Sequence, residues 1–165
     1  MSEIERSYGF EIDAPCGEVF GLLSDARVLN SLTPHWFDLE ILSSCPGEMY
    51  VGKEISYWLR WRGIRFLWKS RVTAWEPASF FAYEQVTGPF RSFVHEHSFF
   101  DGSASTWVTD RVTYRPPGGG IADWLIVAGD LGRIFSFRER VVEALVRRAT
   151  REAGGGSVRL PRVGY

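Results

Sequence analysis

The chain opens with a strict alternation of apolar and polar positions, which is the two-residue period of a β-strand. Within residues 3–12, one face carries mainly apolar side chains, among them Tyr8, Phe10 and Ile12, and the other face carries polar ones. This pattern predicts a first strand with one covered face.

The spacing of apolar residues then changes to that of a helix. An apolar side runs from Val19 to Leu23, which predicts a first short helix that ends near residue 25. A second short helix is expected over residues 26–32. It ends before Pro34, because the residue that precedes a proline is pushed out of the helical region.

The middle of the chain is a succession of strand patterns separated by turn residues. Alternation and aromatic content predict six more strands, at residues 39–43, 53–61, 64–75, 80–86, 92–100 and 105–114. Short connections favour antiparallel pairing, and many strands in succession favour strong curvature. Together with the first strand, they predict a curved antiparallel sheet of about seven strands.

A proline- and glycine-rich segment, residues 115–120, ends the last strand. Beyond it, apolar positions recur every three or four residues from about Asp130 to Glu152, which predicts a long amphipathic helix. Residues 124–128 are expected to form a preceding turn, interrupted near Gly129 and Gly132. Residues 1–153 are therefore expected to form a single α+β domain, and residues 154–165 a flexible tail.

Charge and hydropathy exclude several classes of partner. The 165 residues include 19 Lys and Arg against 20 Asp and Glu, a net charge of -1, so no global field attracts nucleic acid or anionic lipid. The longest apolar run, near residues 124–128, is too short to span a bilayer. We expect a cytoplasmic protein without nucleic-acid binding or stable membrane insertion; a homo-oligomer is compatible with the sequence.

Aromatic residues make up 15% of the chain, and many fall in the predicted strands. Two interpretations remain open: a bulky aromatic core, or a pocket whose walls are aromatic. The covered face carries more aromatics than one helix can cover, so we expect an internal cavity of several hundred cubic ångströms, the usual size of a ligand site.

Two histidines interrupt the apolar face of the strand at residues 92–100. Phe93, His95, His97 and Phe99 share that face. A hairpin turn at residues 101–104 that pairs Phe100 with Ser105 would place His95 opposite Asp110, and His97 opposite Val108.

This cluster has three possible roles. Two histidines and one acid can bind a metal, or they can orient a ligand and exchange protons with it. They can also form a buried hydrogen-bonded network in which Asp110 orients His95, and Gln85 or Glu84 satisfies the remaining groups. We favour the network, and we expect neither a metal nor another cofactor. No activated nucleophile or phosphate loop is evident.

The order of elements and a set of short motifs resemble the START-like superfamily, also called SRPBCC, and most closely a bacterial subgroup of polyketide cyclase/dehydratase-type proteins. The resemblance covers residues 4 to about 148. It rests on Leu32-Thr33-Pro34-His35-Trp36, Glu84-Gln85 with Gly88-Pro89, His95-x-His97-x-Phe99, Asp110-x-Val112-x-Tyr114, and Arg133-Ile134-Phe135-x-Phe137-Arg138.

The resemblance implies a helix-grip fold, in which the curved sheet wraps around the long C-terminal helix and two short helices follow the first strand. It also implies a hydrophobic cavity between the sheet and that helix. The strand faces then nominate the cavity lining: Tyr57, Trp61, Phe66, Trp68, Gln85, Phe93, His95, His97, Asp110, Val112 and Phe135, with Trp36 near the mouth.

Three functions follow from this resemblance. The favoured one is a non-catalytic carrier or sensor for a hydrophobic or aromatic small molecule that is lipid-like, polyketide-like or isoprenoid-like. The second is a cyclase/dehydratase-type enzyme, with His95 or His97 as general base and Asp110 holding the imidazole. The third is an interaction module whose vestigial cavity is filled by its own aromatics.

Overall fold

Seven strands form one antiparallel sheet in the computed structural model, which describes residues 3–42, 49–118 and 127–153. The strand order across the sheet is β1-β7-β6-β5-β4-β3-β2. The sequence prediction of the sheet is thereby confirmed. The strands are β1 (Ile4–Ile12), β2 (Glu40–Ile41), β3 (Glu54–Trp61), β4 (Ile64–Glu76), β5 (Phe80–Thr87), β6 (Ser92–Asp101) and β7 (Thr106–Arg115).

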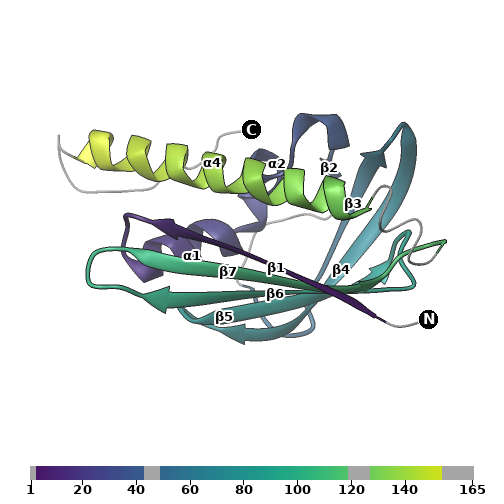
Figure 1. Ribbon diagram of the computed structural model, residues 1–165, viewed down its shortest axis with the longest axis horizontal. Coiled ribbons are helices and arrows are strands. Elements are labelled where there is room, and N and C mark those ends of the chain that lie inside the picture. The colour runs from purple at the N-terminus through teal and green to yellow at the C-terminus, as the bar shows by residue number, and fades with distance from the viewer. Residues whose placement is uncertain (1–2, 43–48, 119–126, 154–165) are drawn as a thin grey trace.

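One long helix lies across a single face of this sheet (Figure 1). The strands β3 and β2 curl up toward its N-terminal end, while α1 lies between its other half and the sheet. This is the helix-grip fold. The helical elements are α1 (Cys16–Ser24), the 3-10 turn η1 (Ala26–Val28), α2 (Leu29–Leu32), the 3-10 turn η2 (His35–Phe37) and α4 (Ala128–Ala153).

The expected interruption at Gly129 and Gly132 is wrong, because α4 runs through both glycines. A glycine inside a helix costs about 1 kcal/mol relative to alanine. Burial of Leu131 and Phe135 against the sheet offsets that cost. Most of the predicted turn at 124–128 and the predicted tail at 154–165 lie outside the described residues.

The register of the β6–β7 hairpin differs from the predicted one by two residues. Phe100 pairs with Trp107 rather than with Ser105, and His97 rather than His95 lies opposite Asp110. The cause is a four-residue loop in which the amide of Gly102 donates to the carbonyl of Ser105, so that β6 extends to residue 101. A shift of two residues leaves every side chain on its predicted face.

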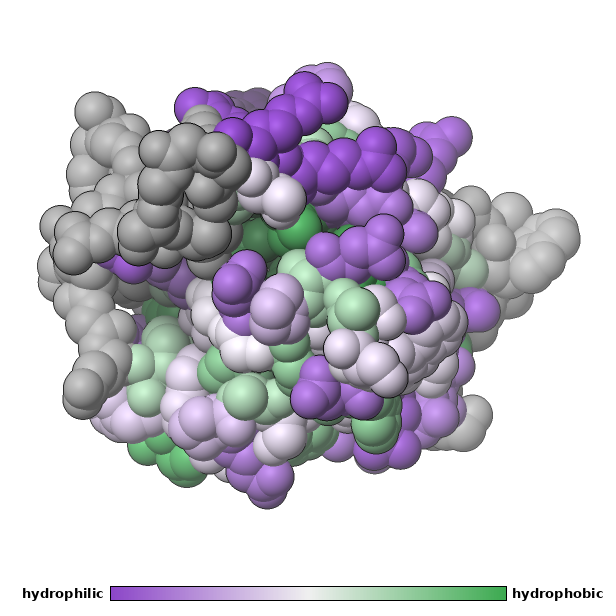
Figure 2. Space-filling view, turned by 90° about the vertical axis from the view of Figure 1, so that its left-hand side faces the viewer, coloured by the Kyte–Doolittle hydropathy of each residue, from purple (hydrophilic) through white to green (hydrophobic). Residues whose placement is uncertain are grey.

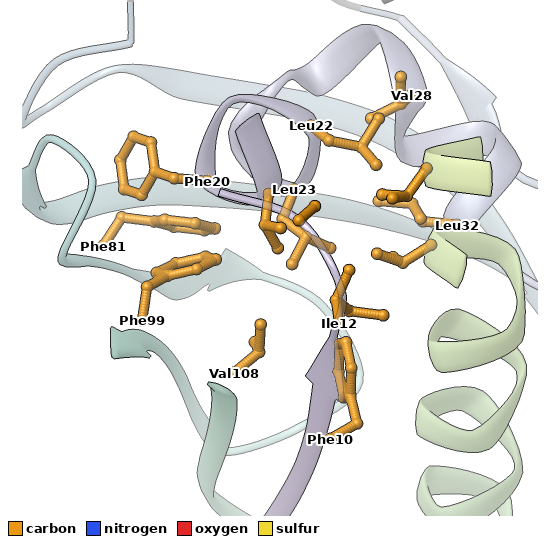
Figure 3. Packing of buried hydrophobic residues seen from close by; sticks show 14 residues of the cluster. Phe10, Ile12, Phe20, Leu22, Leu23, Val28, Leu32, Phe81, Phe99 and Val108 are labelled. Carbon is orange, nitrogen blue, oxygen red and sulfur yellow. The ribbon is translucent and has the colours of Figure 1, made fainter. Parts of the chain in front are cut away.

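Aromatic contacts attach α1 to the sheet. The Phe20 ring meets those of Phe81 and Phe99 edge to face, at centroid distances of 5.7 and 5.2 Å, and Figure 3 shows the three rings packed together beside Leu23. A β-bulge between Val72 and Ala74 brings Trp75 into the same core, with its ring 5.2 Å from that of Phe20.

A second core lies toward the N-terminal half of α4. It is formed by buried aromatic and aliphatic side chains of the sheet and of the helix: Ile55, Tyr57, Trp68, Phe93, Val112, Tyr114, Val127, Leu131 and Phe135.

The surface seen in Figure 2 is mixed in hydropathy. Hydrophilic residues gather along the top of that view, and hydrophobic residues are scattered below them. No helix in the described part of the chain is both long and apolar enough to cross a membrane.

Candidate functional site

A buried polar cluster lies where the two cores meet. His95 and His97 project from β6 and Asp110 projects from β7, all toward α4, with exposed fractions of 2%, 2% and 0%. The alternation of the two strands places all three on the covered face. The antiparallel pairing then brings them within contact distance.

A chain of hydrogen bonds fixes the His95 ring. Its Nε2 lies 2.8 Å from Oδ1 of Asp110, and its Nδ1 lies 2.6 Å from the hydroxyl of Tyr83. An ionised carboxylate only accepts hydrogen bonds, so Nε2 carries the proton and donates it. Nδ1 is then the acceptor, and Tyr83 donates to it.

His97 approaches the same carboxylate from the other side. Its Nδ1 lies 2.6 Å from Oδ1 of Asp110, without the alignment of a hydrogen bond, and its ring stacks on Phe81 at a centroid distance of 4.2 Å. A carboxylate oxygen this close favours the tautomer that carries the proton on Nδ1. The other ring nitrogen, Nε2, is then an acceptor.

Arg138 of α4 supplies the counter-charge to Asp110. Arg138 is 8% exposed, and its Nη1 lies 3.8 Å from Oδ1 of Asp110. It also lies over the ring of Phe135, with Cζ 5.2 Å from the centroid. The long helix is therefore joined to the sheet by a buried ion pair as well as by apolar packing.

The titration behaviour follows from burial. Burial and the neighbouring His97 lower the pKa of His95 to about 3, although Asp110 opposes them. Burial also lowers the pKa of His97. Burial alone would raise the pKa of Asp110, but the two imidazoles outweigh it and the pKa lies below its ordinary value. At neutral pH the cluster therefore holds one carboxylate, one guanidinium and two neutral imidazoles.

The same three side chains are the candidate metal ligands of the sequence. Their donor atoms all lie within 4.8 Å of one another. Two ligands of one zinc ion, however, lie roughly 3.3 Å apart, whereas both ring nitrogens lie 2.6 and 2.8 Å from the same carboxylate oxygen. The contact of His95 is a hydrogen bond and that of His97 a close approach to the same oxygen, and the nearby guanidinium already supplies a positive charge.

Two small cavities lie between the helices and the sheet, and the first of them borders this cluster. The first, about 70 Å³ in volume, lies between the α1–α2 region and the sheet, and its polar wall contains Ser70, Tyr83, His97 and Arg138. The second, about 100 Å³, is almost entirely apolar and lies under the start of α4, beside Trp61, Phe66, Trp68 and Phe93.

We expected one internal cavity of several hundred cubic ångströms, but the two cavities between helix and sheet are much smaller. Aromatic rings occupy the gap between the helix and the sheet. Tyr57 lines the first cavity and Trp68 the second, and their rings stack at a centroid distance of 6.3 Å. Ser70 holds both rings, since it accepts from Nε1 of Trp68 at 3.0 Å and bonds the hydroxyl of Tyr57 at 3.3 Å. The pair forms part of the partition between the cavities.

The remaining residues that were predicted to line the cavity lie in three different places. Val112 and Phe135 are buried in the second core. Trp36 is half exposed and lines an open surface groove with Trp61. Gln85 does not contact the histidines: its side chain bonds both backbone groups of Phe90 and so braces the preceding turn.

Tyr83 and Arg138 are the site residues that the sequence interpretation missed. Tyr83 takes the role expected of Gln85 or Glu84, because β5 pairs Tyr83 directly with His95. The sequence did contain a sign that Arg138 is buried and paired. It is a cation within the apolar stripe of α4, and such a residue is buried only when it has a partner.

The chain belongs to the family described as polyketide cyclase / dehydrase and lipid transport, whose sequence pattern it matches over residues 12–147. A search of curated proteins found no match.

Solved structures show the same fold at low sequence identity. The ZhuI aromatase/cyclase from Streptomyces sp. R1128 aligns with a TM-score of 0.73 and 19% identity, over 93% of this chain and 99% of that chain. Truncated norcoclaurine synthase from Thalictrum flavum aligns with a TM-score of 0.66 and 16% identity, over 88% and 94%. The di-domain aromatase/cyclase StfQ aligns with a TM-score of 0.69 and 14% identity, over 92% of this chain and 52% of that chain.

The depressed histidine pKa values predict a loss of stability in mild acid. Below about pH 6.5 the unfolded chain takes up protons that the folded cluster excludes, so the free energy of unfolding falls by about 1.4 kcal/mol per pH unit for each histidine. For His95 this fall in the free energy of unfolding continues toward its folded pKa of about 3, and Asp110 adds to the loss of stability below about pH 4.

Urea denaturation between pH 4 and 7 measures the slope, that is, how steeply the free energy of unfolding falls as the pH is lowered. His97→Phe should flatten it and the exposed-site control His35→Phe should not; equal slopes in the two variants would contradict the assignment.

Removal of the partition should join the two cavities. We expect Tyr57→Ala to cost about 3–5 kcal/mol of stability, because it deletes a buried ring, and to shift size selectivity toward larger ligands, with N-phenyl-1-naphthylamine gaining at least about tenfold in affinity relative to benzamide because the rings no longer have to part. The measurements are denaturant melts and isothermal titration calorimetry. Tyr50→Ala, at a ring that is 59% exposed, is the control. Unchanged size selectivity in a folded Tyr57 variant would show that the ring does not divide the space.

Proposed function

We propose that the protein is a cytoplasmic carrier or sensor that binds a hydrophobic or aromatic small molecule with a polar end. The observation that carries this proposal is the first cavity. Leu23, Leu29 and Leu32 of the short helices form its apolar side, and the polar groups of the buried cluster converge on the opposite side. Apolar walls with a few fixed polar groups are the usual construction of a small-molecule site.

The geometry also indicates how a ligand enters. Ser24, Asp25 and Ala26, where α1 ends and η1 begins, line the cavity and are only half buried, so the cavity reaches the surface beside them. A volume of about 70 Å³ is below the usual size of a ligand site. A larger ligand therefore needs the stacked rings of Tyr57 and Trp68 to part.

Family membership supports the same class of ligand. The family description names both cyclases and lipid transport, and structural relatives include an aromatase/cyclase and a norcoclaurine synthase. A lipid or an aromatic molecule has a large apolar surface, which suits a cavity with leucine, valine and aromatic walls.

The second candidate is a cyclase/dehydratase-type enzyme, and one observation favours it. Asp110 contacts His97, and His97 lines the cavity, so Nε2 is the ring nitrogen that could accept a proton from a substrate. Binding without catalysis is nevertheless favoured, because burial lowers the pKa of His97. An imidazole with a lowered pKa is a weak general base.

Filling the cavity should abolish binding without unfolding the protein. Val72 is buried and lines the first cavity, so Val72→Phe places a ring inside it. We expect the wild type to bind the neutral fluorescent probe N-phenyl-1-naphthylamine, and the variant to bind it at least about tenfold more weakly, while its melting temperature stays within a few degrees. Fluorescence titration and thermal melts are the measurements.

The matched control is Val86→Phe, on the exposed side of β5, which should bind the probe like the wild type. Failure of the wild-type protein to bind any apolar probe would contradict the proposal and favour an interaction module with a vestigial cavity. Turnover of a poly-β-ketone substrate, lost in His97→Phe, would favour the enzyme.

A further inference from the structure

We propose that the ligand of the first cavity carries a carboxylate, and that Arg138 binds it. This inference rests on the proposed function, since it names the chemistry of the ligand at that same site. Arg138 is the cation among the residues that line the cavity; the residue is only 8% exposed, and its Nε is buried.

The hydrogen-bonding capacity of Arg138 is not used up within the described residues. A guanidinium has five N–H donors, and Nε of Arg138 has no hydrogen-bond partner there although it is buried. The guanidinium donates to the hydroxyl of Tyr83, and its contact with Asp110 is a long one, 3.8 Å from Nη1 to Oδ1. A buried cation with unmet donors at the wall of a cavity is matched by a ligand with an anionic oxygen, and a planar carboxylate fits the guanidinium fork best.

The other polar groups of the wall do not offer the same match. Asp25 is itself an anion and is paired with Arg27. Tyr83 lies within hydrogen-bond distance of His95 and donates its proton there. Ser70 is engaged with Tyr57 and Trp68. His97 presents Nε2 as an acceptor, so it would repel an anion while neutral. Recognition of a carboxylate therefore falls to Arg138.

Charge balance adds a second expectation. Asp110 and Arg138 cancel, so a bound carboxylate leaves the buried cluster with one excess negative charge. The titratable and charged groups that face this space are Tyr57, Tyr83, His95, His97, Asp110 and Arg138, together with Asp25, a carboxylate of the cavity wall whose charge is balanced by its ion pair with Arg27. Of these, His97 lies at the cavity wall and can take up a proton to restore neutrality. Binding of the acid should therefore be accompanied by uptake of about one proton from solution.

The test compares ligands with one apolar body and different heads: 2-naphthoic acid and 2-naphthamide, with benzoic acid and benzamide as a smaller pair. Calorimetry in buffers of different ionisation enthalpy gives both affinity and proton uptake at pH 7. We expect the wild type to prefer the acid at least about tenfold, with proton uptake for the acid alone.

Arg138→Met should abolish the preference while the neutral probe N-phenyl-1-naphthylamine still binds. Because this variant leaves Asp110 without its counter-charge, the double variant Arg138→Met/Asp110→Asn removes both charges and keeps the cluster neutral. It should bind acid and amide with equal affinity. The control is Arg140→Met, an exposed site on the same helix, which should keep the preference.

The two proposals fail in different ways. If neither the neutral probe nor any aromatic ligand binds the wild type, the proposed function is wrong. If the neutral probe binds but the wild type shows no preference for acids, or the double variant keeps that preference, the assignment of Arg138 is overturned and the proposed function stands. Acid binding without proton uptake would place the anion away from this cluster and would also overturn the assignment.

Discussion

The structure depends on one interaction that is costly in free energy, the burial of the Asp110 carboxylate on the covered face of β7. Removing a carboxylate from water costs several kcal/mol unless partners compensate for it. Here the partners come from three elements: His95 donates to it, His97 contacts it, and Arg138 supplies a positive charge from α4. The long helix must therefore dock in one orientation, because only that orientation brings the guanidinium near the carboxylate.

This constraint explains why the interior is divided. Apolar side chains pack against each other on both sides of the cluster, and so produce two cores rather than one. The first cavity opens where the cluster faces the short helices, because the polar groups there point inward and α1–α2 does not fill the space. The ligand site that we propose is thus a consequence of how the ion pair is held.

Periodicity predicted the fold and the faces of the strands, but not the pairing of individual residues. Alternation placed His95, His97 and Asp110 on the covered face, and an error of two residues in the hairpin register did not disturb that result. Which histidine lies opposite Asp110 depends on the length of the 102–105 loop, and the sequence pattern alone does not determine that length. The assignment of Gln85 failed for the same reason, since pairing with β5 brings Tyr83 to His95.

Side-chain packing was the least predictable level. A count of aromatics on the covered face cannot say whether the rings leave a cavity or fill it; here the stacked pair of Tyr57 and Trp68 fills the centre. The role of Arg138 likewise depends on the docking of α4, which no local pattern encodes. Its position in an apolar stripe was a sign that a buried partner exists, and the partner is Asp110.

The protonation of the cluster is the central claim, and nitrogen NMR of the imidazole rings tests it directly. The account predicts that at pH 7 both buried histidines are neutral, that His95 carries its proton on Nε2 and that His97 carries its proton on Nδ1. Nitrogen chemical shifts and ring-proton couplings distinguish these tautomers from each other and from the imidazolium. A charged imidazole at His95, or a proton on its Nδ1, would contradict the hydrogen-bond chain from Tyr83 to Asp110, and with it the account of the site.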